Sequence, residues 1–288
     1  MYEDHFGLRE APFGITPDTS FLFACRSHRQ ALNLLLIAAK SGEGFTKIVG
    51  EVGTGKSLLC RRFLALSSNE FRCAYIPNPY LEPRALLLVL AEELGMAVDA
   101  AADQHSVLRS LNLALLNLAR AGKRVVLCLD EAQAMPIETL ETLRLLSNLE
   151  TEKRKLLQVI LFGQPELEQK LARNSIRQLR QRITYQYRLS GLTRAELRDY
   201  LAHRMNIAGY RGGPVFDATA VATLARASRG VPRLVNILAH KSLLAAYGEG
   251  RVQVNGRDAR RARADTPEAY RWWRAPALRS WRWNWSRP

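Results

Sequence analysis

The feature that most constrains this chain is the run Gly50-Glu51-Val52-Gly53-Thr54-Gly55-Lys56-Ser57, which fits G-x-x-x-x-G-K-[ST]. The apolar run Phe45 to Val49 precedes it, and a helical pattern that starts at Leu58 follows it. Glycines let a loop curl until successive backbone N–H groups face one anion, and the next helix adds its positive N-terminal end. The sequence therefore predicts a nucleotide-phosphate site over residues 50–58, in which Lys56 reaches the β- and γ-phosphates and Ser57 ligates Mg²⁺.

A second signal is the pair of carboxylates Asp130 and Glu131, which directly follows the apolar run Val125 to Leu129. Open α/β sheets bind ligands at the carboxyl ends of their strands. An exposed acidic turn would look the same in isolation, but the phosphate loop earlier in the chain favours a shared site. We expect Asp130 to join the magnesium shell and Glu131 to polarise the attacking water.

Polar residues elsewhere are weaker candidates. Gln164 follows the apolar run Leu156 to Phe162 and would contact the γ-phosphate or its water, although a Gln at a strand end also forms turns. Arg180 and Arg182 precede the last apolar run and are equally compatible with solvated helix charges. Arg233 lies in the first turn of a helical pattern, where the dipole opposes a cation, which suggests either an anionic target or simple hydration.

Apolar runs alternate with helical patterns through the first two thirds of the chain. Five runs read as strands, at residues 45–49, 72–76, 124–129, 156–162 and 183–189. This alternation predicts an α/β fold, with a parallel sheet flanked by helices. After residue 189 only helical patterns follow, over 193–207, 217–228 and 232–247. We therefore divide the chain into an N-terminal segment 1–44, a nucleotide-binding domain 45–189, a helical domain 190–265 and a tail 266–288.

Composition limits the setting of the protein. With 47% hydrophobic and 24% charged residues, the chain is not wholly disordered, collagen-like or a disulfide scaffold. The four cysteines form no CxxC pair and are expected to be free thiols in a reducing compartment. We see no signal peptide and no apolar stretch near the roughly 18 residues of a membrane span, so we expect a cytoplasmic protein.

Several strings together resemble the AAA+ ATPases, and specifically the ExeA/GspA-like secretion ATPases. The strings are Tyr2-Glu3-Asp4-His5-Phe6-Gly7-Leu8, Pro12-Phe13, Pro17-Asp18, Gly42-Glu43-Gly44-Phe45, the phosphate loop, Asp130-Glu131-Ala132-Gln133, Gly163-Gln164-Pro165-Glu166-Leu167 and Gly230-Val231-Pro232-Arg233. They cover about residues 1–265, and their order is more specific than the phosphate loop alone. Within the family, the chain is most similar to members that serve mannose-sensitive haemagglutinin (MSHA) pili.

The resemblance implies a P-loop NTPase fold, with a three-layer αβα five-stranded parallel sheet and a helical lid. It implies ATP and Mg²⁺ as ligands, ATP hydrolysis, a homo-oligomer, and inner-membrane proteins of a type IV pilus or type II secretion machine as partners. It places Gln164 at the sensor-1 position, Arg182 at the arginine finger with Arg180 as the nearby alternative, and Arg233 at sensor 2. It also implies that Asn78 restrains the catalytic Glu131, and that the segment around Phe13 and Phe21 packs near the adenine.

Net charge keeps a second function open. The formal net charge is +15, and residues 251–288 hold ten arginines against three acidic residues. A DNA-associated ATPase like the transposition helper proteins would share the same core, although we find no helix-turn-helix or zinc signature. The tail interleaves all five tryptophans, from Trp272 to Trp285, with arginines. It would suit an anionic membrane surface or single-stranded nucleic acid, or have no binding role.

Overall fold

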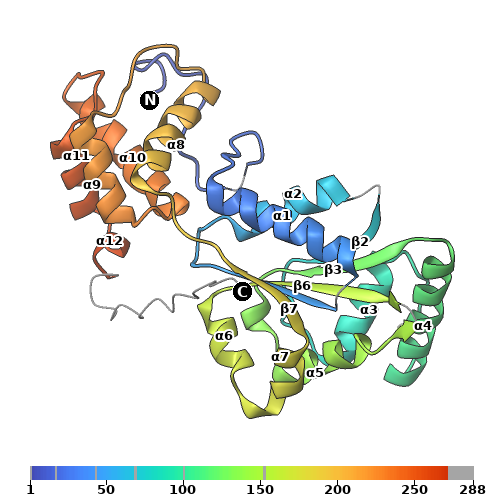
Figure 1. Ribbon diagram of the computed structural model, residues 1–288. Helices are drawn as coiled ribbons and strands as arrows, with labels where there is room; N and C mark the ends of the chain where they lie inside the picture. Colours follow the sequence, from blue (N-terminus) through green and yellow to red (C-terminus); the bar gives the residue numbers. More distant parts are fainter. Residues whose placement is uncertain are drawn as a thin grey trace, which may run out of the picture. The chain divides into compact units, whose positions relative to one another are not determined.

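A computed structural model of the chain describes residues 2–16, 18–42, 44–67, 70–99, 101–151 and 154–271 (Figure 1). The chain forms two compact units. The sheet unit consists of Gly14–Glu196 together with Val231–Arg233. The helical unit consists of Met1–Phe13, Leu197–Gly230 and the described part of Leu234–Pro288. The Trp/Arg segment of the tail, from Trp272 onward, lies outside the described residues.

The sheet unit is built on five parallel strands in the order β2-β3-β6-β1-β7. Their bounds are β1 Phe45–Val49, β2 Phe71–Ile76, β3 Arg124–Leu129, β6 Leu157–Gly163 and β7 Ile183–Arg188. The predicted fold class, an α/β protein with a five-stranded parallel sheet, is thereby confirmed. The carboxyl ends of β1, β6 and β7 are in register, because Val49 pairs with both Gly163 and Arg188. The residues that follow these strands are thus brought to one edge of the sheet.

Successive residues of β3 face opposite sides of the sheet, and both sides are buried. Val125, Leu127 and Leu129 belong to one core cluster, whereas Val126 and Cys128 belong to another. The cluster of Val126 contains α1 (Arg26–Ser41) and α2 (Lys56–Ser67). The cluster of Val125 contains α3 (Pro83–Glu93), α4 (Gln104–Arg120), α5 (Ile137–Leu146), α6 (Pro165–Leu171) and α7 (Arg177–Gln181). The result is three layers, helices–sheet–helices (Figure 1), and the need for apolar residues on both faces explains the continuous apolar runs.

The structure contains short helices and strands that the sequence pattern did not predict. The helices α6 and α7 have seven and five residues, which is too short for a helical period to be recognised. A two-stranded antiparallel pair joins β4 (Glu150–Thr151) to β5 (Arg154–Lys155) between α5 and β6. The longer predicted helices and strands differ from the observed ones by one to three residues at their ends, as helix and strand termini commonly do.

The helical unit contains most of α8 (Arg194–Ile207) and α10 (Pro232–Gly248), all of α9 (Ala218–Ser228) and α11 (Gly256–Ala264), and the short α12 (Glu268–Arg271). The first residues of the chain pack into it. The Tyr2 hydroxyl is 2.9 Å from His240 Nδ1, and the Arg9 N–H donates to the Ala208 carbonyl over 2.7 Å. Residues 1–44 are therefore divided between the units, since α1 packs on the sheet.

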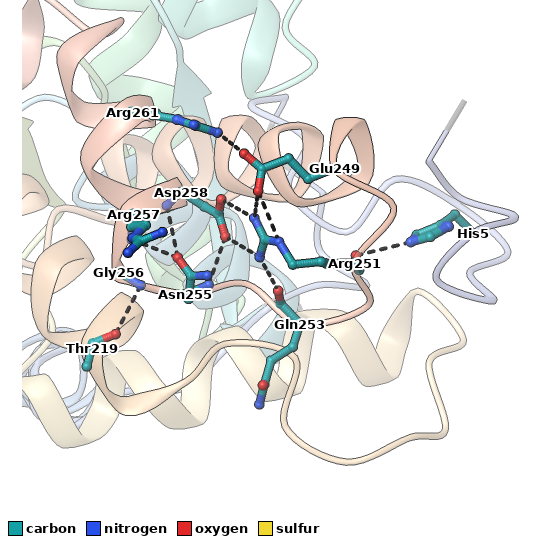
Figure 2. Close-up of polar contacts among 10 residues, drawn as sticks. All are labelled: His5, Thr219, Glu249, Arg251, Gln253, Asn255, Gly256, Arg257, Asp258 and Arg261. Carbon is teal, nitrogen blue, oxygen red and sulfur yellow. Dashed lines mark hydrogen bonds and ion pairs between the residues drawn. The ribbon is translucent and has the colours of Figure 1, made fainter.

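A paired polar network closes the turn from α10 to α11 (Figure 2). The Arg251 guanidinium donates to Glu249 and to both oxygens of the fully buried Asp258. Asp258 also accepts from the Asn255 N–H, and Asn255 Oδ1 accepts from the Asp258 N–H, so the two residues form a capping box. This reciprocal pairing satisfies donors at the start of α11 that the helix leaves without partners. No helix in the described part of the chain is long and apolar enough to span a membrane.

Candidate nucleotide-binding site

The phosphate loop lies between β1 and α2, and its lysine is buried. Lys56 is 4% exposed, and its Nζ donates to the carbonyls of Gly50 (2.9 Å) and Glu51 (3.1 Å). Burial lowers the pKa of Lys56, an effect that the nearby carboxylates of Glu131 and Asp130 oppose. The ammonium group is thus placed inside the loop at a cost in solvation, which a bound anion would offset.

Two glycines of the loop have left-handed backbones and close neighbours. Gly53 has φ 78° and Gly55 has φ 90°, a region that side chains with a Cβ rarely adopt. A Cβ added at Gly53 would come within 2.4 Å of Arg233 Cβ, and one added at Gly55 within 2.8 Å of His28 Nε2. These glycines are therefore required both by the curl of the loop and by the residues that pack against it.

Asp130 follows β3 and is buried beside the start of α2. It is 3% exposed, and burial raises its pKa, while hydrogen bonds from the Ser57 hydroxyl and the Glu131 N–H (3.0 Å) act in the opposite direction. A hydroxyl and a carboxylate are oxygen donors of the kind that Mg²⁺ prefers. The described residues hold no group of three or more His, Cys, Asp or Glu side chains that could bind a metal alone. The donor set therefore fits a Mg²⁺ ion that takes its other ligands from phosphate and water.

Glu131 is held in a defined orientation by two glutamines. Its backbone has φ 51°, which is uncommon for a residue other than glycine. The Oε2 atom accepts from Gln133 Nε2 and from Gln164 Nε2, the latter over 2.8 Å. The Gln164 N–H donates over 3.0 Å to Gln133 Oε1. Because each end of the Gln133 amide has its own partner, the amide bridges the residues that follow β3 and β6.

Gln133 and Lys170 are residues of the site that the sequence analysis assigned no role. Lys170 Nζ donates to the carbonyls of Gln133 and Met135, the latter over 2.6 Å. These bonds connect α6 to the turn that carries Gln133. The sequence signals for Gln133 were its position two residues after Glu131 and its place in the string Asp130-Glu131-Ala132-Gln133. Lys170 lies among the ordinary charges of a helix and had none.

Three predicted residues, Asn78, Arg180 and Arg182, form no hydrogen bond or ion pair with Glu131 in the described part of the chain. Asn78 is exposed after β2, and its Oδ1 accepts from the Tyr80 N–H at 3.3 Å. The Arg182 guanidinium donates to the Arg144 carbonyl (3.0 Å) and to Ser147 Oγ (2.6 Å) at the end of α5. Arg180 is exposed on α7. In this structure, Gln133 and Gln164 rather than Asn78 contact the Glu131 carboxylate.

Arg233 and the phenylalanines of the opening segment are placed as follows. The Arg233 N–H donates to the Gly53 carbonyl at 3.2 Å, which brings the start of α10 onto the phosphate loop, and its side chain is exposed. Phe21 is buried in the sheet unit. Phe13 instead packs edge-to-face on Phe216 in the helical unit, with ring centroids 5.8 Å apart.

Known proteins share both the sequence and the fold. Residues 39–171 match the family described as "AAA domain". The chain is 42% identical over 250 residues to general secretion pathway protein A of Aeromonas hydrophila, covering 87% of this chain and 46% of that protein. The chain therefore spans about half the length of this relative.

Solved structures with a similar fold have low sequence identity. Cdc6p of Pyrobaculum aerophilum has a TM-score of 0.63 at 21% identity, covering 86% of this chain and 70% of that one. The RuvB branch-migration motor of Thermotoga maritima has a TM-score of 0.54 at 16% identity, covering 83% and 68%. These likenesses establish the fold alone. The matched AAA domain, the phosphate loop beside Asp130 and Glu131, and the identity to the Aeromonas protein together show that this chain belongs to the GspA-like family of AAA ATPases.

Proposed function

We propose that the protein binds ATP at residues 50–58 and hydrolyses it with Glu131 as the general base. The observation that carries the proposal is the position of Glu131, which directly follows Asp130 and is held by Gln164 Nε2 at 2.8 Å. A carboxylate at this place accepts a proton from the water that attacks the γ-phosphate. The amide of Gln164 keeps the carboxylate pointed at that water.

Binding of the phosphates falls to the loop and the start of α2. The backbone N–H groups of the loop and of the first turn of α2 bind phosphate oxygens, and Lys56 adds a charge-assisted contact. When bound, Mg²⁺ neutralises the phosphate charge, and the Ser57 hydroxyl and the Asp130 carboxylate hold it. The buried Lys56 and Asp130, whose charged forms are disfavoured by burial, support a site that takes up charged ligands.

The test of ATP binding is a titration of the purified protein with a fluorescent ATP analogue in the presence of Mg²⁺. Lys56→Ala removes the ammonium contact to the phosphates, and we expect binding to weaken by at least about tenfold, as for loss of a charge-assisted hydrogen bond. The exposed Lys123, replaced by alanine, is the matched control. Equal affinity of wild type and Lys56→Ala would contradict the proposed site.

The active form is an oligomer in which an arginine completes the site of the neighbouring subunit. Arg182 is bound within its own chain to α5, whereas Arg180 is exposed, which favours Arg180 as the residue that reaches the neighbour. An arginine supplied in trans is worth about 10³–10⁵ in rate in other NTPases.

Mixed subunits test this assignment. Arg180→Ala subunits mixed with Glu131→Gln subunits should recover part of the ATPase activity, because one type of interface then pairs an intact arginine with an intact base. The same mixture made with Arg182→Ala compares the two arginines directly. A strictly monomeric mass with ATP, and a specific activity independent of protein concentration, would contradict the oligomer.

The ATPase cycle serves assembly of a type II secretion machine or an MSHA-like type IV pilus at the cytoplasmic face of the inner membrane. This role is supported by the 42% identity to general secretion pathway protein A of Aeromonas hydrophila. Affinity purification of the full chain from its own cells, followed by identification of bound proteins, tests it. Recovery of pilus or secretion proteins of the inner membrane is expected, and their absence would contradict it.

A second candidate, a DNA-associated ATPase, is favoured by the net charge of +15. Lys and Arg side chains bind phosphate backbones with an affinity that falls steeply with salt. ATPase activity stimulated by DNA, together with salt-dependent DNA binding, would favour this function over secretion.

The peripheral membrane role of the tail rests on Trp272 and the residues after it, and vesicle flotation of the full chain and of residues 1–265 tests it.

A further inference from the structure

A histidine from the first turn of α1 lies against the phosphate loop. His28 Nε2 is 2.9 Å from the Thr54 carbonyl oxygen, and His28 Nδ1 is 2.9 Å from Cys25 Sγ. Cys25 is 3% exposed, and His28 is half-buried. All three residues belong to the sheet unit. Sequence analysis treated Cys25 as a free thiol and gave His28 no role.

The partners determine which ring nitrogen carries the hydrogen. A carbonyl oxygen only accepts, so Nε2 is the donor to Thr54. In a neutral imidazole Nδ1 is then the acceptor, and the Cys25 thiol donates to it. Burial lowers the pKa of His28 and raises the pKa of Cys25, although the bond to Thr54 acts against the first shift and a hydrogen bond from the His28 backbone N–H against the second. Both groups are therefore in the neutral forms that this chain of hydrogen bonds needs.

The bond to Thr54 determines how the next peptide group is oriented. In a trans peptide the C=O and the N–H point in opposite directions. Because the Thr54 carbonyl is turned toward His28 of α1, the Gly55 N–H points away from α1. The Thr54 side chain is held as well, because its hydroxyl donates to the Glu51 carbonyl at 2.8 Å.

We propose that His28 is a positioning residue for the phosphate site, which aims the Gly55 N–H at the bound phosphate by holding the Thr54 carbonyl. This inference rests on the proposed binding of ATP. The close approach that it requires is visible at Gly55, where a Cβ would lie 2.8 Å from His28 Nε2. The absence of a side chain at Gly55 thus leaves room for the His28 ring as well as for the phosphate.

The proposal separates the hydrogen bond from the packing of the ring. His28→Gln keeps an N–H at about the position of Nε2, whereas His28→Asn places its amide nearer to Nδ1, and His28→Leu has no donor. We expect affinity for a fluorescent ATP analogue to fall about three- to tenfold in His28→Leu and in His28→Asn, the loss of one hydrogen bond. His28→Gln should bind within about twofold of wild type.

Controls distinguish the possible failures. His105→Leu, at an exposed histidine of the same unit, should bind as wild type does. Melting temperatures show whether each variant is folded. If His28→Leu is unfolded, the comparison of His28→Gln with His28→Asn alone tests the proposal. Equal binding by the Gln and Asn variants, or wild-type binding by His28→Leu, would overturn the role of His28. Absence of binding by the wild type itself would overturn the proposed function instead.

Discussion

The pKa shifts at the nucleotide site disfavour the charged forms of its residues, whereas those in the helical unit favour them. At the nucleotide site, burial lowers the pKa of Lys56 and raises that of Asp130, so both charged forms are disfavoured. In the helical unit, burial acts on Asp258 in the same sense, but hydrogen bonds from Arg251 and Asn255 outweigh it and the pKa falls. Hydrogen bonds to Asp258 and Glu249 raise the pKa of Arg251.

The difference separates charges that complete a structure from charges that await a ligand. Arg251, Glu249 and Asp258 satisfy one another within the helical unit (Figure 2). Lys56 donates only to uncharged carbonyls in its two loop contacts, and Asp130 accepts from a hydroxyl and an N–H. Buried charges without full compensation mark functional sites, and they reduce stability in return for binding.

The largest effect that we expect is on hydrolysis at Glu131. Glu131→Gln cannot accept a proton from water, so turnover should fall by about 10²–10⁴. ATP affinity should stay close to wild type, because the phosphates are bound by the loop and Lys56. Phosphate release and analogue binding measure the two properties. Glu138→Gln, at an exposed position of α5, is the control, and a wild-type rate in Glu131→Gln would refute the mechanism.

The next effect is on stability, in the helical unit. Asp258→Ala removes one acceptor of Arg251 and the acceptor of the Asn255 N–H, and we expect a loss of about 2 kcal/mol in the free energy of unfolding. The melting temperature should fall by about 5 °C, while Asp199→Ala at an exposed aspartate should change it little. An unchanged melting temperature would mean that the network in Figure 2 adds no stability.

The same carboxylate predicts a pH dependence. Because the pKa of Asp258 is lower in the folded than in the unfolded state, its contribution is fully present above the unfolded value. That contribution is lost as the pH falls through the folded value. Asp258→Ala should therefore flatten the acid side of the stability curve relative to wild type. Parallel curves for the two proteins below about pH 4, the usual range of the carboxyl, would argue against the assignment.

A smaller effect is expected at Gln133. Gln133→Leu removes both the donor to Glu131 and the acceptor for the Gln164 N–H. We expect kcat to fall about tenfold, the cost of losing a bond to a charged group, while nucleotide affinity changes little. Gln169→Leu, at an exposed position of α6, is the control. Equal losses in kcat and in affinity would indicate a general structural role rather than one in positioning Glu131.

The smallest effect tests the comparison most directly. Asp130→Asn removes a charge that burial disfavours, so without nucleotide we expect the melting temperature to rise by about 1–3 °C. The raised pKa means that ionised Asp130 reduces stability above its folded value, which is the reverse of Asp258. A fall in melting temperature like that of Asp258→Ala would show that the two carboxylates play the same role.

Local patterns were sufficient to predict the sheet, and they brought the phosphate loop and the acidic pair forward as the candidate site. Strand-like runs predicted all five strands of the sheet. The reason is clearest for the inner strands β1, β3 and β6, which are buried along nearly their whole length, whereas the edge strands β2 and β7 are only partly buried. The phosphate loop and the pair Asp130–Glu131 follow directly after strands, so a motif and its neighbours located them. The division of the chain into two compact units could not be predicted from local patterns. Residues 2–13 pack with helices some 200 positions later through contacts such as Tyr2 to His240, which no local pattern encodes.

The sequence by itself was thus enough to predict which residues would bind phosphate and magnesium, because these functions depend on residue types at fixed short spacings. Only the tertiary structure decided what holds those residues in place. The side-chain contacts of His28, Gln133 and Lys170 are one or two hydrogen bonds each, mostly with backbone groups, and many residue types at many positions can make such bonds. Arg182, which matches a family position, donates to the end of α5 in its own chain, a contact that the sequence did not indicate. Contacts between distant segments depend on the packing of α1, α5 and α6 around the sheet, and that packing exists only in the folded chain.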